Sequence, residues 1–237
     1  MNLITTTAVY QGVTSLPNKV NTLIFTIDGT GKKPVAVPIF LIPSFAARET
    51  SVPGAYELGT KLLINGRLYP NSEDGKMYVV PTQELQPVSK ELTINQVHLA
   101  GGIGFIDKQH NENVFNFGLM CKAPPQKSLG HTWQDSLPFR AECWNDEARR
   151  MKKFVYVGRQ MSLGGALKFE TWMDKNNERC SRYKVRIKAA QYSFFGKNQK
   201  SEEAVEKQPA MQFDSPHQQA MSTPPVKTQK GDDEIPF

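Results

Sequence analysis

Tryptophans and basic side chains lie at matching positions in two short segments of the chain. Arg140 and Trp144 are an even number of residues apart, and so are Lys168 and Trp172. Because successive side chains of a strand point to opposite faces, each pair shares one face of an extended segment. Single-stranded nucleic acids bind such faces, since bases stack on aromatic rings and phosphates contact cations. A core or interface position remains the alternative for any one tryptophan.

This pattern defines a set of candidate contacts for a nucleic acid. Trp144 and Trp172 are the first candidates for base stacking, and the further ones are Trp133, Phe40 and Tyr69. The candidate phosphate contacts are Arg140, Arg159, Lys168, Lys175 and Arg67. For each of these cations the alternative is an ordinary solvated surface charge.

The last six residues form a second candidate site, of a different kind. They are Asp232, Asp233, Glu234, Ile235, Pro236 and Phe237. Three acidic side chains precede two apolar ones, which flank a rigid proline beside the terminal carboxylate. A partner with a hydrophobic pocket ringed by Lys or Arg would capture this hexapeptide. A tail that serves solubility alone does not account for the apolar ending, so we expect a protein-docking tip.

Catalytic and metal-binding patterns are absent from the sequence. It contains no nucleophile elbow and no Walker loop, and the glycine cluster at 101–104 is not followed by a helix pattern. This cluster therefore predicts a bulged or sharply bent strand. Three cysteines without a C-x-x-C and four separated histidines predict neither a disulfide framework nor a metal site, and no cofactor is expected. An enzyme would need a nucleophile, metal or nucleotide site in residues 1–90, where none is evident.

Short runs of β-formers, separated by proline and glycine, predict an all-β chain. The predicted strands span residues 22–27, 35–42, 61–68, 76–80, 97–106, 113–121, 137–144, 154–160, 166–172 and 182–189. One helix is predicted at 145–153, with Asn145 as its N-cap, acidic residues in its first turn and basic residues in its last. About five strands per half, with a short helix after the third, suit two OB-type Greek-key barrels in tandem.

The two halves also resemble each other weakly. Residues 61–70 and 153–162 both carry an apolar run followed by Gly-Arg, and segments 34–43 and 137–146 precede them. We interpret this as an internal duplication. Shared period-2 alternation of any two β halves is the alternative.

The composition changes along the chain. Residues 91–196 contain 16 Lys and Arg against 10 Asp and Glu, whereas residues 197–237 contain 5 against 7. The segment 197–231 is rich in Lys, Gln, Glu, Ser and Pro and has no periodicity, which predicts a disordered linker. The expected domains are therefore 1–92, an OB-like barrel; 93–196, the main nucleic-acid-binding barrel; the linker 197–231; and the tip 232–237. No run approaches the ~18 apolar residues of a membrane span.

The segment from Asn95 to Gly196 resembles bacterial single-stranded-DNA-binding proteins. The motifs NQVHLAGGIGFI, NVFNFGLMC, PFRAECWNDEARRMKKFVYVGRQ and KFETWMDKNNERCSRYKVRI look like that family's successive strands, helix and hairpin. The family's stacking aromatics match Trp144 and Trp172, while a third has no clean match near Trp133. The ending DDEIPF resembles the family's acidic tip, with Glu where Asp is usual. Two barrels per chain resemble the variants in which a homodimer supplies four.

This resemblance implies a non-enzymatic, sequence-tolerant binder of single-stranded DNA, cytoplasmic and associated with the nucleoid. Its tip would recruit replication and repair proteins such as helicases, nucleases, recombination mediators and primosome or clamp-loader subunits. In the first half, Phe40 is expected where Trp144 lies in the second, with Tyr69 and Arg67 beside it. An RNA-binding or primosomal OB paralogue is the alternative. The first barrel is expected to be the weaker DNA contact and to serve chiefly as an assembly surface.

Overall fold

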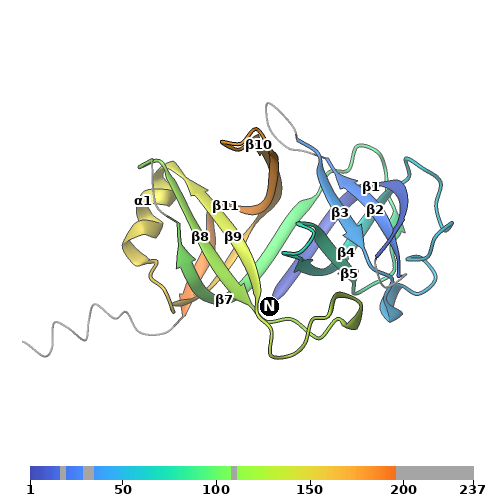
Figure 1. The fold of residues 1–237 in the computed structure, drawn as a ribbon, viewed down its shortest axis with the longest axis horizontal. Helices are drawn as coiled ribbons and strands as arrows, with labels where there is room; N and C mark the ends of the chain where they lie inside the picture. Colours follow the sequence, from blue (N-terminus) through green and yellow to red (C-terminus); the bar gives the residue numbers. More distant parts are fainter. Residues whose placement is uncertain (17–19, 29–34, 108–110, 196–237) are drawn as a thin grey trace, which may run out of the picture. The chain divides into compact units, whose positions relative to one another are not determined.

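The computed structural model describes residues 1–16, 20–28, 35–107 and 111–195. The expected linker and the tip at 232–237 lie outside the described residues. Strands dominate the described chain, and they are arranged in two barrels with one α-helix (Figure 1). The expected all-β fold is confirmed.

The first barrel is closed by five strands. β1 pairs with β2, β2 with β3, β3 with β5 in parallel, β5 with β4, and β4 again with β1. This order, with one parallel pair between the third and fifth strands, is that of an OB barrel. The strands are β1 (Asn2–Ser15), β2 (Asn21–Ile27), β3 (Val37–Leu41), β4 (Lys61–Pro70) and β5 (Met77–Pro81), and a short β6 (Gln86–Pro87) pairs with β4.

The second barrel repeats the same pairing order. β7 pairs with β8, β8 with β9, β9 with β11 in parallel, β11 with β10, and β10 again with β7. The elements are β7 (Asn95–Ile106), β8 (Val114–Cys121), β9 (Leu137–Trp144), α1 (Asn145–Phe154), β10 (Gln160–Met173) and β11 (Arg179–Phe195). The duplication is therefore present in the topology.

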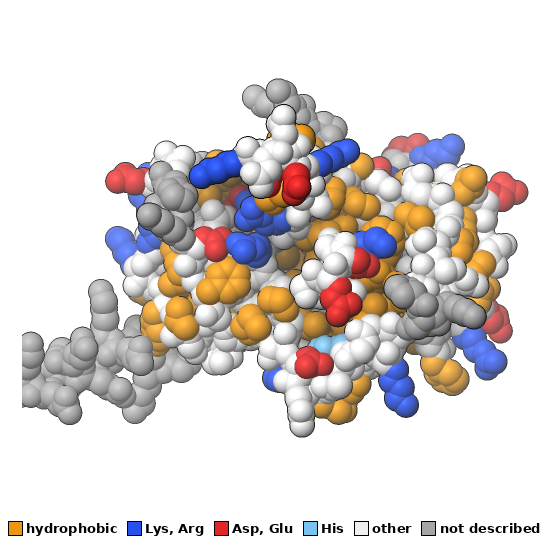
Figure 2. Space-filling model, viewed as in Figure 1, with side chains coloured by type: hydrophobic (Ala, Val, Ile, Leu, Met, Phe, Trp, Pro, Cys, Tyr) orange, Lys and Arg blue, Asp and Glu red, His pale blue; other side chains and the backbone are white. Residues whose placement is uncertain are grey.

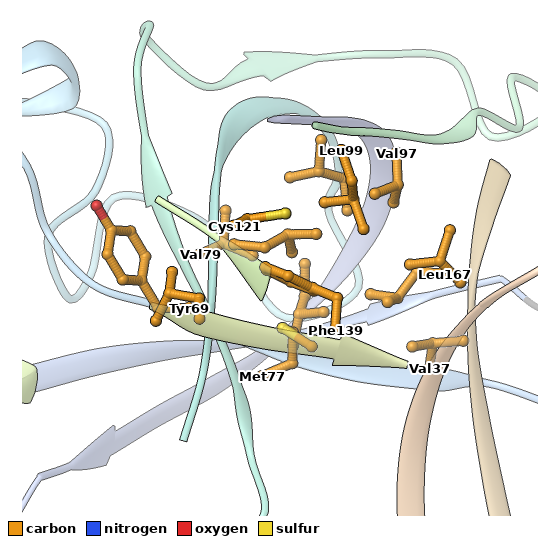
Figure 3. Packing of buried hydrophobic residues seen from close by; sticks show 14 of the residues in the cluster. Val37, Tyr69, Met77, Val79, Val97, Leu99, Cys121, Phe139 and Leu167 are labelled. Carbon is orange, nitrogen blue, oxygen red and sulfur yellow. The ribbon is translucent and has the colours of Figure 1, made fainter. Parts of the chain in front are cut away.

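The two barrels are joined through their equivalent first strands. β1 pairs antiparallel with β7, from Asn2 opposite Leu99 to Thr6 opposite Asn95. The buried apolar residues of both barrels form one continuous cluster, and Figure 3 shows members from each barrel, such as Met77 and Phe139. Burial of this cluster is the main favourable term for the fold.

Buried side-chain donors of the first strand bind to backbone carbonyls. The buried Asn2 side chain donates to the carbonyl of Leu68 at 2.5 Å, and the Thr6 hydroxyl donates to that of Ile94 at 2.9 Å. Residues 1–15 were not among the predicted strands, because their buried face carries polar residues between apolar ones. Hydrogen bonding removes the cost of burying such groups.

Three local predictions around α1 need correction. The predicted strand 154–160 is wrong: α1 ends at Phe154, a turn follows, and β10 begins at Gln160. Gly158 in this turn has φ +92, which glycine adopts without strain. Segments 61–70 and 153–162 are consequently not equivalent, since the first is a strand and the second spans a helix end. The N-cap is Trp144 rather than Asn145, and no side chain caps the helix.

Other local predictions are confirmed. The strand β7 has a register shift between Ile103 and Phe105, as expected for a bulge at the glycine cluster. A side chain at Gly101 would place its Cβ 2.1 Å from the carbonyl oxygen of Met120, so the close approach of β8 requires glycine there. On β9, Phe139, Ala141 and Cys143 are buried, as the alternation predicted.

Candidate nucleic-acid interface

The end of the hairpin formed by β10 and β11 is an arm that lies against the first barrel. The Tyr183 hydroxyl donates to the carbonyl of Pro38 in β3 at 2.7 Å, and the Phe169 ring packs on the Tyr183 ring with centroids 4.8 Å apart. Phe169 and Tyr183 are cross-strand partners and share one face of the arm. The opposite face carries Trp172 and Arg182. The arm therefore holds these two side chains in a fixed place.

A cleft of about 520 Å³ opens beside the arm. Its walls come from the turn between β4 and β5, from β9 and from the arm, and Met77, Phe139 and Leu167 are among the apolar residues that line it. Figure 2 shows hydrophobic side chains in this hollow, with Lys and Arg side chains beside it. An apolar floor with a charged rim suits a ligand that is part planar ring and part anion, as a nucleotide is.

Basic side chains follow the outer face of β11. Arg182, Lys184 and Arg186 alternate with the inward-facing Tyr183 and Val185, so all three cations point to the same side. Arg182 and Arg186 are about 13 Å apart at the ordinary rise of a strand. The alternation of cations with apolar or aromatic residues from 182 to 188 was visible in the sequence.

Two of these arginines stack on tryptophans. The Arg182 guanidinium carbon lies 4.4 Å from the centroid of Trp172, and that of Arg186 lies 5.2 Å from the centroid of Trp144. Trp172 is 37% exposed and Trp144 is 43% exposed. Each tryptophan thus combines a cation against its ring with a surface open to solvent. We call Arg140, Trp144, Trp172, Arg182, Lys184 and Arg186 the β9–β11 face.

A buried carboxylate lies in the middle of this face. Glu142 is 2% exposed, and its Oε1 accepts hydrogen bonds from Arg186 Nε at 3.0 Å and Nη2 at 2.9 Å. Its Oε2 accepts one from Lys184 Nζ at 3.1 Å. Burial acts to raise the pKa of Glu142, but a hydrogen bond from Trp144 and the nearby Lys184 and Arg186 outweigh it and lower the pKa below its ordinary value.

The surroundings of the face favour negative ligands. Burial lowers the pKa of Lys168 on β10, and the positive charges of Arg186 and Lys188 lower it further. Arg140 lies 5.2 Å from the Phe105 ring centroid and pairs with Asp107 at 2.7 Å. Only the part of this shift that comes from Arg186 and Lys188 reflects neighbouring positive charges, and such charges attract an anion.

Part of the predicted set comes together here. Trp172 and Arg140 line the cleft, Trp144 lies farther along the face, and Lys168 is on the neighbouring strand. Lys175 is exposed in the turn at the tip of the arm. The structure adds Arg182, Lys184 and Arg186 from β11, together with Phe105 and Lys76, which the sequence reasoning missed.

The first barrel contributes one side of the cleft. Lys76 lines it, and the Lys76 Nζ lies 5.0 Å from the ring centroid of Phe40 on β3. Phe40 in turn packs on Tyr78, with ring centroids 5.8 Å apart. Phe40 therefore has a cation beside it, as Trp144 and Trp172 have.

Other predicted residues lie elsewhere. Tyr69 is 3% exposed and donates its hydroxyl to the carbonyl of Pro124 at 2.9 Å, so a base has no open ring face to stack on. Arg159 is 8% exposed, donates to the carbonyl of Phe154 at 2.6 Å and lies 4.2 Å from the Phe194 ring centroid. Its guanidinium is used inside the fold, so the expected phosphate contact is not supported.

Two further candidates lie outside the cleft. Trp133 is 68% exposed, in the loop before β9, whereas Trp144 ends that strand. The strand that ends at Trp144 begins at Leu137, four residues after Trp133, and is about 23 Å long. Arg67 is half-buried on β4, opposite Val80, and does not line the cleft. Both remain predictions, separate from the β9–β11 face.

The described ranges give no support for a metal site or for a membrane-crossing helix. They hold no group of three or more His, Cys, Asp or Glu side chains placed to bind a metal ion. In the same part of the chain, no helix is both long and apolar enough to cross a membrane.

Comparison with solved structures places this architecture among known proteins. The wild-type single-stranded DNA binding protein from Thermus aquaticus matches with a TM-score of 0.55, covering 83% of this chain and 94% of that one at 14% identity. The fold is that of this single-stranded DNA binding protein. A deletion variant of the same Thermus protein matches with a TM-score of 0.57, 14% identity, and 83% and 95% coverage. No protein-family model and no curated protein matches the chain.

The match to the Thermus protein extends over both barrels. Because either barrel alone is about half of the chain, 83% coverage includes both. The likeness to the Thermus single-stranded DNA binding protein is thus to the pair of barrels. The resemblance predicted from the sequence is confirmed at the level of the fold.

Proposed function

We propose that this chain binds single-stranded DNA along the β9–β11 face, without catalysing a reaction. The supporting observation is the pair of Arg–Trp stacks on one side of β11, Arg182 on Trp172 and Arg186 on Trp144. Bases stack on the exposed ring surface, and the arginines and Lys184 contact phosphates. Such contacts read no base sequence, so binding is sequence-tolerant.

The fold supports this assignment independently. OB barrels bind oligonucleotides on the outer face of their strands, and the Thermus protein that shares this two-barrel fold is a DNA-binding protein by name. We propose that residues 93–196 form the main binding domain. Residues 1–92 form the weaker one and contribute Lys76 and Phe40 at the cleft.

The experiment is a titration of the full chain with oligo-dT, oligo-U and a DNA duplex of equal length. We expect quenching of tryptophan emission by oligo-dT and a log–log salt slope of about −0.7 for each phosphate contacted. Weaker binding of the duplex is expected, because its bases are already stacked. Absence of quenching and of complex formation at low salt contradicts the proposal. Preference for oligo-U would instead favour the RNA-binding alternative.

We further propose that the hexapeptide Asp232–Phe237 recruits replication and repair proteins to the coated strand, at the nucleoid. The support is its chemistry: acidic side chains, then Ile-Pro-Phe. Deleting these six residues is expected to leave oligo-dT binding intact at physiological salt and to abolish co-purification of DNA helicases and nucleases. Unchanged co-purification would contradict this role.

The expected assembly is a homodimer with four barrels. The mass of the free protein in solution tests it, since the chain mass is 26.6 kDa. A mass near twice this value supports the dimer, and a tetramer contradicts it.

A further inference from the structure

We propose that Glu142 is a positioning residue that holds Trp144, Arg186 and Lys184 in the geometry that binds single-stranded DNA. This inference rests on the proposed function of the β9–β11 face. It concerns a side chain that, by charge alone, would oppose a polyanionic ligand.

The position of Glu142 is unusual for a carboxylate. It lies on β9 in the set with Arg140 and Trp144, which faces away from the barrel interior, yet it is 2% exposed. The side chains around it, not the barrel core, cover it. A buried charge is unfavourable unless it is paired and hydrogen-bonded. The ionised Glu142 carboxylate is therefore stable in this buried position only because its partners donate hydrogen bonds to it.

These partners are all members of the proposed binding face. Arg186 donates two hydrogen bonds to one carboxylate oxygen, and Lys184 donates to the other. Trp144 joins this network through Arg186, whose guanidinium carbon lies 5.2 Å from the Trp144 ring centroid. One carboxylate thus orders two cations, and one of these packs on a stacking ring.

The resulting geometry is suited to the ligand. With its Nε and Nη2 on Glu142, Arg186 lies flat enough to place its guanidinium carbon 5.2 Å from the Trp144 centroid. The Arg186 side chain remains 44% exposed, so it also reaches solvent. A ring and a cation that are already ordered lose less conformational entropy when the strand binds.

The test compares two substitutions, each of which replaces one carboxylate by an uncharged amide. Glu142→Gln removes the carboxylate of the network, and Glu112→Gln removes an exposed carboxylate in the loop before β8. If charge alone mattered, both variants would bind oligo-dT equally well or more tightly than the unaltered chain. We expect Glu142→Gln to bind about tenfold more weakly, near the lower end of one stacked base, and Glu112→Gln not to weaken. Equal or tighter binding by Glu142→Gln overturns the proposal.

A readout without DNA separates this inference from the proposed function. Acrylamide quenching of Trp144 is obtained as the difference between each protein and its Trp144→Phe derivative. We expect Trp144 to become more accessible to acrylamide in Glu142→Gln and to remain unchanged in Glu112→Gln. If the unaltered chain fails to bind oligo-dT, the proposed function fails, while this result still decides the role of Glu142. Identical quenching in all three proteins overturns it.

A second variant covers the case in which Glu142→Gln does not fold. Glu142→Asp keeps the charge and withdraws the carboxylate by one methylene group. We expect the same increase in Trp144 accessibility, smaller in size, with a cooperative thermal transition. Unchanged accessibility and unchanged oligo-dT affinity in the aspartate variant would likewise contradict a positioning role.

Discussion

The guanidinium carbon of Arg182 lies 4.4 Å from the ring centroid of Trp172, across neighbouring strands of an arm that is docked on the first barrel. Farther along β11, Arg186 lies in the same way against Trp144, which ends β9. Cation–aromatic pairs of this kind offer a base an ordered ring and offer its phosphate a nearby charge.

Removing either ring is expected to weaken binding. Trp172→Ala and Trp144→Ala each lose one stacked base, worth about 1–3 kcal/mol, so affinity for oligo-dT falls about 5- to 150-fold. The measurement is fluorescence anisotropy of labelled oligo-dT at fixed salt. Phe45→Ala is the matched control, because Phe45 is 91% exposed on the first barrel, away from the cleft. A control variant that weakens as much as the tryptophan variants would refute the assignment.

Lys76 is expected to contribute through its charge. Lys76→Gln removes a cation from the first-barrel wall of the cleft, so the log–log salt slope becomes less negative by about 0.7. The control is Lys90→Gln, whose exposed side chain lies outside the cleft. If both slopes equal that of the unaltered chain, the first barrel does not contact the strand at the cleft.

Cys180 provides a test that needs no substitution. It is partly exposed and lies directly opposite Trp172, whereas Cys121 and Cys143 are buried and their thiols have pKa values raised by burial to about 11 and about 12. Thiolates are the reactive form, so one thiol reacts quickly with a disulfide reagent and two react slowly. We expect oligo-dT to slow the fast reaction. Protection of the slow thiols alone would place the strand elsewhere.

Glu142 also predicts a dependence of stability on pH. Burial raises its pKa, but Trp144, Lys184 and Arg186 together lower it below the ordinary 4.5. The ionised carboxylate therefore stabilises the fold above about pH 4.5, and this contribution is lost as the pH falls through the lower folded-state value. Urea unfolding at several pH values should show a gap between the unaltered chain and Glu142→Gln that narrows below about pH 4.5. A gap independent of pH would be inconsistent with this account.

Local alternation in the sequence was sufficient to predict which side chains share part of the candidate face. The faces of β9 followed from period-2 spacing, and Arg140, Trp144 and Trp172 were identified in this way. The burial of Tyr69 and Arg159 was not predicted, because their partners Pro124 and Phe194 lie 55 and 35 residues away in the sequence. Burial by such distant contacts leaves no local pattern.

The fold was predicted to a similar extent. Two OB-type barrels followed from strand spacing, but the strand β1 (Asn2–Ser15) was missed. Its buried Asn2 and Thr6 are tolerated only because carbonyls of Leu68 and Ile94 accept their hydrogen bonds. The predicted strand 154–160 failed because α1 ends at Phe154 and the turn at Gly158 precedes β10. Tertiary contacts decided the first case, and a local turn decided the second.

Photochemical cross-linking tests the location of the DNA most directly. An oligo-dT carrying 5-iodouracil, irradiated in complex with the full chain and mapped by mass spectrometry, reports which aromatic side chains touch bases. We expect cross-links at Trp172 and Trp144, on the β9–β11 face. Cross-links confined to Trp133 or to residues of the first barrel outside the cleft would contradict this assignment.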